Sequence, residues 1–212
     1  MKAMRIVSRA LTAAALIAAT TSCGNVVRSS RAPVILVVDS LAGIRGAATL
    51  GQATSNLVSD VITIVTTGGT CTTTTPCPTV FGDTGQVVLH IVLKDIGLPG
   101  TTPAPSTNNE VTVNRIHVSY RRTDGRNQEG VDVPYGFDTA STATITGTGT
   151  VTMGFPLVRV QAKQEAPLIA LRTNGQVLSM IGDVTFFGQD VVGNAVSATG
   201  SINIDFGNFG DQ

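Results

Sequence analysis

Two histidines, His90 and His117, are the only side chains of this 212-residue chain that commonly serve as a general base near neutral pH. Nucleophilic catalysis needs such a base beside a Ser or Cys and an orienting carboxylate. The apolar residues around His90 alternate, which places His90 on the opposite face of its strand, and His117 shares an outer face with Arg115. No G-x-S-x-G or comparable nucleophile motif occurs. We therefore expect a non-catalytic protein, with a hydrolase as the less favoured alternative.

Metal ligation is the second chemistry that the side chains suggest. No H-x-x-x-H, C-x-x-C or EF-hand spacing is present, so no metal or other cofactor is expected. Carboxylate and amide side chains do gather near the C-terminus, where loop carboxylates can hold Ca²⁺, although solvated turn residues are the commoner explanation. The sequence leaves open whether Ca²⁺ binds near Asp190 and Asn194. The whole group comprises Asp183, Asp190, Asn194 and Asp205.

Positive charge is concentrated between residues 115 and 126. Arg115, His117 and Arg121 fall on one face of the expected strand, and Arg122 follows directly. These four residues are candidates for docking an acidic protein or a polysaccharide. A solvated outer strand face, which also protects a sheet edge against aggregation, is the alternative.

Cys23 follows a segment with the layout of a secretory signal: a basic start, an apolar stretch and three small polar residues. The apolar stretch, residues 10 to 19, would be about 15 Å long as a helix, half of a hydrocarbon core of ~30 Å. A permanent membrane span is therefore excluded for this stretch, and cleavage is expected. The basic residues are Lys2, Arg5 and Arg9, and the small ones are Thr20, Thr21 and Ser22.

The residues before Cys23 resemble the lipobox of bacterial lipoproteins, in which the cysteine thiol receives a diacylglycerol and the chain is then cut before it. Thr21 and Ser22 fit this pattern, whereas Thr20 stands where the family usually has Leu. An ordinary signal peptide that leaves Cys23 as a free thiol is the alternative. The resemblance implies a lipid anchor at Cys23.

The same resemblance implies a location in the bacterial cell envelope. Gly24 stands where Asp marks retention in the inner membrane, so the outer membrane is the implied destination. Residues 1–22 would form the signal peptide, residues 23–33 a lipidated tether, and residues 34–212 the folded domain.

Composition narrows the partners of the mature chain. Three of the 14 basic residues and none of the 14 acidic ones lie in residues 1–22, which leaves a net charge of 11 − 14 = −3. This mild acidity, with no basic run, argues against nucleic acid and against a second, electrostatic membrane contact. The remaining pair, Cys71 and Cys77 in CTTTTPC, predicts a structural disulfide in an oxidising compartment, because redox pairs are usually C-x-x-C at a helix start.

Strict alternation of apolar and polar residues gives the clearest structural signal. Residues 143–153, ATITGTGTVTM, have Thr at every second position, and residues 195–206 alternate in the same way. A period of two is what a half-buried strand requires. We expect residues 180–187 to form a further strand. Gly193 and Asn194 lie between this strand and residues 195–206 and can adopt positive φ, which predicts a hairpin of the two strands. Its D-x-x-G-N turn resembles the closing strands of bacterial immunoglobulin-like domains.

Other segments complete the expected fold. We expect residues 86–96 and 110–122 to be paired strands, residues 51–60 to hold a helical turn at most, and residues 164–172 to form a helical turn. About nine strands punctuated by Gly and Pro predict an all-β, antiparallel, immunoglobulin-like sandwich. The expected function is lipid-anchored binding or scaffolding in the envelope, with another envelope protein or a polysaccharide as partner. An accessory subunit of a secretion or surface-fibre assembly is the alternative.

Overall fold

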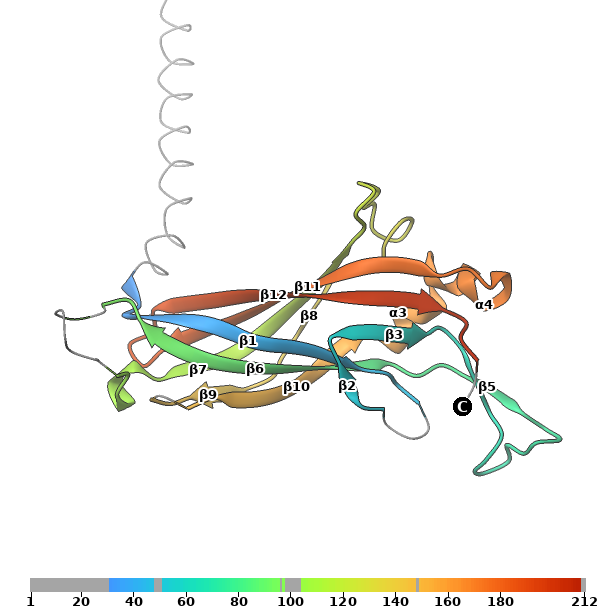
Figure 1. The fold of residues 1–212 in the computed structure, drawn as a ribbon, viewed down its shortest axis with the longest axis horizontal. Helices are drawn as coiled ribbons and strands as arrows, with labels where there is room; N and C mark the ends of the chain where they lie inside the picture. The colour runs from blue at the N-terminus through green and yellow to red at the C-terminus, as the bar shows by residue number, and fades with distance from the viewer. Residues whose placement is uncertain (1–30, 48–50, 96, 98–103, 148, 211–212) are drawn as a thin grey trace, which may run out of the picture.

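The computed structural model describes residues 31–47, 51–95, 97, 104–147 and 149–210. Two sheets pack face to face in a sandwich whose strands run along its long axis (Figure 1). All strand pairs except one are antiparallel. The predicted all-β antiparallel sandwich is therefore confirmed, with twelve strands in the described residues where about nine were expected.

The four-stranded sheet has the order β10-β6-β1-β2. These strands span Val151–Val158, Asp83–Leu93, Val34–Ile44 and Ala53–Thr54, respectively.

The six-stranded sheet has the order β3-β12-β11-β7-β8, and β9 also pairs with β7. In that order, the strands span Asn56–Asp60, Ala195–Gly207, Leu178–Asp190, Val111–Arg121, Phe137–Thr139 and, for β9, Ala143–Ile145.

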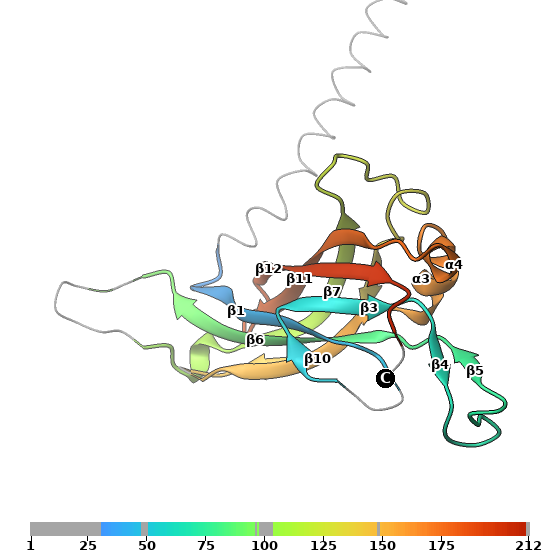
Figure 2. The same cartoon turned by 45° about the vertical axis from the view of Figure 1, so that its right-hand side comes forward.

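A small arm and a few helical turns complete the fold. Strands β4 (Thr63–Val65) and β5 (Cys77–Thr79) pair in an arm at the end of the sandwich opposite the start of β1 (Figures 1 and 2). The helical elements are η1 (Thr107–Asn109), α3 (Val160–Gln164), η2 (Leu168–Ala170) and α4 (Leu171–Asn174). The helical turn predicted for residues 164–172 is confirmed by η2 and α4, which end two residues beyond that range.

The core lies between the sheets, because alternate side chains of each strand point inward. Phe155 of β10 packs edge-on against Phe186 of β11, with 5.6 Å between the ring centroids. Tyr120 of β7 donates its hydroxyl to the backbone oxygen of Leu157 at 2.6 Å, and burial raises the pKa of Tyr120 above its ordinary value. These contacts join the two sheets.

The predicted C-terminal hairpin is confirmed as β11 and β12. Met180, Val184 and Phe186 are buried, as the alternation requires. Gly193 has a φ of 85°, whereas Asn194 does not adopt positive φ. Glycine alone therefore supplies the left-handed residue of this turn.

The prediction of one strand over residues 143–153 is wrong. Strand β9 pairs with β7 in one sheet and β10 pairs with β6 in the other, so the chain changes sheets between them. Gly147, with a φ of 52°, lies in this connection. Glycine adopts this left-handed backbone without steric cost, which ends the strand although the alternation of residue types continues.

Two further predictions need correction. Strands β6 and β7, which cover most of residues 86–96 and 110–122, lie in different sheets and do not pair. Residues 51–60 form β2 and β3 rather than a helical turn. Strand β3 pairs in parallel with the end of β12 and buries Leu57. These tertiary contacts make the segment a strand, although its local sequence has no clear strand pattern.

Candidate functional site

Strand β7 carries the predicted cations on the outer face of the six-stranded sheet. The side chains of Arg115, His117 and Arg121 are 50%, 40% and 48% exposed. We call these three residues the cation row. Their outward direction agrees with the alternation in the sequence.

A β-bulge sets the register of the cation row. Gly188 of β11 pairs with Val113, and the preceding residue of β11 pairs with Arg115, so Asn114 is the extra residue of β7. Val113 and Ile116 are consequently both fully buried although they are three positions apart. The bulge turns the strand so that the cation row stays on the outer face.

Each member of the cation row lies beside an aspartate from a neighbouring strand. Arg115 Nη1 lies 2.9 Å from Asp138 Oδ1, and His117 Nδ1 lies 3.3 Å from the same oxygen. Arg121 Nε lies 2.6 Å from Asp183 Oδ2. The face therefore carries paired charges rather than the unopposed positive charge that residues 115–126 suggest.

Neighbouring side chains hold the cation row in place. The Arg115 guanidinium lies 3.7 Å from the centroid of the Phe187 ring, which is cation–π geometry. Ser201 Oγ donates to Asp183 Oδ1 at 2.6 Å. The outer face thus presents side chains whose positions are fixed by several contacts each.

Arg122 belongs to a separate cluster beyond the end of β7. Arg122 Nη2 lies 2.5 Å from Asp124 Oδ2, and Arg126 Nη2 lies 2.8 Å from the same oxygen. The hydrogen bonds donated by Arg122 and Arg126 hold the pKa of Asp124 well below its ordinary value, and donation to Asp124 raises the pKa of Arg126. The structure therefore does not bring Arg122 into the cation row.

The two histidines lie on opposite outer faces of the sandwich. His90, on β6 of the four-stranded sheet, has its Nδ1 2.6 Å from Asp39 Oδ1. His117 pairs with Asp138 on the six-stranded sheet. The two imidazoles cannot cooperate in one site, because the core separates them.

The carboxylates considered for Ca²⁺ already accept hydrogen bonds from protein groups. Asp190 Oδ1 accepts from the backbone N–H groups of Val192 and Asn194, and its Oδ2 accepts from Asn194 Nδ2. Asp205 accepts from Ser179 Oγ. Among the described residues, no group of three or more His, Cys, Asp and Glu side chains could hold a metal ion.

The predicted disulfide between Cys71 and Cys77 is confirmed. It closes the loop of the β4–β5 arm, where the side chain and backbone of Thr72 both bond Thr75. Figure 2 shows this arm extending away from the two sheets. The disulfide therefore stabilises a peripheral loop rather than the core.

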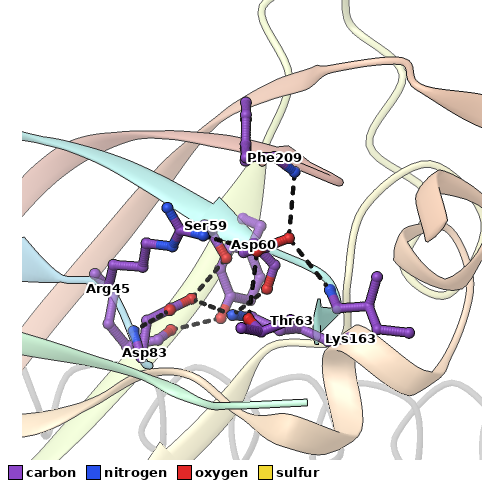
Figure 3. A network of polar contacts seen from close by, with 11 residues as sticks. Arg45, Ser59, Asp60, Thr63, Asp83, Lys163 and Phe209 are labelled. Atoms are coloured by element: carbon purple, nitrogen blue, oxygen red, sulfur yellow. Dashed lines mark hydrogen bonds and ion pairs between the residues drawn. The ribbon is translucent and has the colours of Figure 1, made fainter. Parts of the chain in front are cut away.

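A network of buried polar residues lies around the end of β3, the start of β6 and helix α3 (Figure 3). Lys163 of α3 is fully buried, and its Nζ lies 2.8 Å from Asp83 Oδ2 at the start of β6. The same ammonium donates to the backbone oxygen of Asp60 at 2.8 Å. Burial lowers the pKa of Lys163, although Asp83 opposes this shift. We call this the buried network; it comprises Arg45, Ser59, Asp60, Thr63, Asp83 and Lys163.

Both aspartates of the buried network have several donors. Asp83 accepts from Ser59 Oγ at 2.6 Å and from the backbone N–H of Gly46 at 2.8 Å. Asp60 Oδ2 lies 2.7 Å from Arg45 Nη2. Buried charged groups require hydrogen-bond partners of this kind, because they have lost their contacts with water. The network joins the residue after β1 to β3, β4, β6 and α3 at one end of the sandwich.

The sequence does not reveal the buried network, because no local pattern marks it. Lys163 and Asp60 are separated by 103 positions. Each residue alone is an ordinary polar residue at the end of a strand or in a short helix. Only the fold brings them together.

Comparison with protein-family models, curated proteins and solved structures found no match to this chain. In the described ranges, no helix is long and apolar enough to cross a membrane. Cys23 and the expected signal peptide lie outside the described residues.

Proposed function

We propose that this protein is a non-catalytic, lipid-anchored binding or scaffolding protein of the bacterial cell envelope. The observation that carries the binding role is the cation row of Arg115, His117 and Arg121, about half exposed and held by Asp138 and Asp183. Side chains fixed in advance lose little conformational entropy when a partner binds. This favours a docking surface on the outer face of the six-stranded sheet.

A protein partner fits this face better than an acidic polysaccharide. The cation row alternates with carboxylates, so its field at a distance is weak, whereas a partner at contact meets both signs of charge. The Phe187 ring is covered by Arg115 and offers no open aromatic surface for a sugar ring. A second envelope protein with paired charges of its own is the proposed partner.

The accessory-subunit alternative is favoured by the β4–β5 arm. This arm projects from the sandwich and is closed by the disulfide between Cys71 and Cys77. Such a projection offers a neighbouring subunit a contact surface outside the sandwich. Loss of assembly in a variant that lacks residues 68–76 would favour this alternative over simple docking.

The tether follows from the lipobox resemblance and from the position of β1. In Figure 1, β1 begins at the end of the sandwich opposite the arm. An acyl chain on Cys23 would hold that end toward the bilayer, because each buried methylene contributes about 0.8 kcal/mol. The arm would then point away from the membrane.

Membrane fractionation of Cys23→Ala tests the anchor. We expect this variant to move into the soluble fraction, whereas a control with Cys71→Ala and Cys77→Ala should stay with membranes. Mass spectrometry of the wild-type N-terminus should show an acylated Cys23. A Cys23→Ala protein that still sediments with membranes would contradict the anchor.

Co-purification from solubilised membranes tests the docking face. The variant with Arg115→Ser, His117→Ser and Arg121→Ser should lose its partner. The matched control, Asp39→Ser with His90→Ser, removes an outward histidine–aspartate contact from the other sheet and should retain the partner. Equal recovery of partners by both variants would contradict the proposed face.

A further inference from the structure

We propose that Lys163 and Asp83 condense into an intramolecular amide, a covalent cross-link between Lys163 Nζ and Asp83 Cγ. The two groups are already in contact, since Nζ lies 2.8 Å from Oδ2. Both side chains are 0% exposed, and Lys163 is the largest of the fully buried side chains. This inference is independent of the proposed envelope function.

The surroundings of Asp83 suit attack on its carboxyl carbon. Ser59 Oγ donates to Oδ2, and the backbone N–H of Gly46 donates to Oδ1. Fixed donors of this kind stabilise the negative charge that develops on oxygen when a nucleophile adds to the carbon. The backbone oxygen of Asp60 accepts from Lys163 Nζ and thereby fixes the direction of the amine.

The condensation balances without any co-reactant. A proton passes from the ammonium to the carboxylate, which leaves a neutral amine and a carboxylic acid. The amine nitrogen forms a bond to Cγ, one carbon–oxygen bond breaks, and that oxygen leaves as water with two of the three original ammonium protons. Burial lowers the pKa of Lys163, which favours the neutral amine that the first step requires.

Burial would also stabilise the amide once it has formed. An ion pair in the interior pays a desolvation cost on both charges. An amide carries no net charge, and exclusion of bulk water from this site disfavours its hydrolysis. The cross-link would join α3 to the start of β6 and enclose residues 83–163 in a covalent loop.

Peptide mapping of the purified, reduced, full-length chain tests the cross-link. Trypsin cannot cleave after an acylated lysine, so residues 160–172 should appear joined to residues 46–94. The joined species should be lighter by one water than the sum of its two peptides, and fragmentation should place the bond at Asp83. Complete cleavage after Lys163 without a joined species would overturn the proposal, as would a bond to Asp60.

Lys163→Arg is the matched variant, because it keeps a cation beside Asp83 but offers a guanidinium, which is a far poorer nucleophile. Trypsin should cleave after position 163 in this variant, so peptides 46–94, 160–163 and 164–172 should be recovered separately. If this variant does not fold, the wild-type map still decides the question. Peptide 46–94 joined to either 160–163 or 164–172 in Lys163→Arg would overturn the assignment to Lys163.

Discussion

The buried network and the cation row use the same kinds of side chain in opposite environments. In the buried network, Lys163 and Asp83 are fully buried and 2.8 Å apart. In the cation row, Arg121 and Asp183 are 2.6 Å apart but remain 48% and 25% exposed. Distance alone therefore does not distinguish an ion pair that supports the fold from one that is available to a partner.

Burial determines how much each kind of ion pair affects the free energy of unfolding. Water and salt screen the exposed pairs, which typically contribute less than about 1 kcal/mol each. Removal of one partner from a buried pair leaves an uncompensated charge, which costs about 3–5 kcal/mol. The two regions should therefore respond very differently to mutation.

The largest expected effect is that of Lys163→Met. Relative to the uncondensed ion pair, we expect it to lower the free energy of unfolding by about 3–5 kcal/mol, because Asp83 is left buried without its counter-charge. Loss of the proposed amide would add to this effect. Denaturant titration followed by circular dichroism measures this. Adding Asp83→Asn should recover part of the loss, since the buried charge is removed. A loss below about 1 kcal/mol would contradict the claim that the buried network matters more for stability than the cation row.

Reduction of the disulfide should have an intermediate effect. Closing so short a ring contributes about 2 kcal/mol in the chain-entropy model, an upper figure because Pro76 and the threonines already stiffen the loop. We expect faster proteolysis near Thr73 while the sandwich stays folded. Two free thiols in protein purified without reductant, or global unfolding on reduction, would contradict this.

The cation row should be nearly neutral for stability. Changing Arg115, His117 and Arg121 to Ser should alter the free energy of unfolding by no more than about 0.5 kcal/mol at each position. Thermal unfolding of the triple variant measures this. A fall of many degrees would show that these side chains support the fold as the buried network does.

The smallest expected effect concerns Asp124. Arg122 and Arg126 depress its pKa, so the stability that it contributes is present above its ordinary pKa of 3.8 and is lost as the pH falls through the folded value. An NMR titration should place its midpoint below 3.8. Arg122→Gln with Arg126→Gln should raise that midpoint, and an unchanged midpoint would contradict the two contacts.

The sequence predicted those features that depend on local patterns. Alternation identified the inward Met180, Val184 and Phe186 and the outward cation row, and the spacing of Cys71 and Cys77 identified the disulfide. Each of these signals lies within one short segment of chain.

Features that depend on distant segments were not predictable in this way. The alternation across residues 143–153 continues through Gly147, where the chain leaves one sheet for the other. Asp138 and Asp183, which balance the cation row, come from β8 and β11. Lys163 meets Asp83 only once β10 has paired with β6, which places Val158 opposite Asp83.

Photo-cross-linking in intact cells tests the proposed docking face most directly. A photoreactive amino acid replaces His117 in one variant and His90 in the other, since both histidines face outward beside an aspartate but lie on opposite sheets. The account predicts a discrete covalent adduct with an envelope protein from position 117 and none from position 90. No adduct from position 117, or the same adduct from both positions, would contradict it.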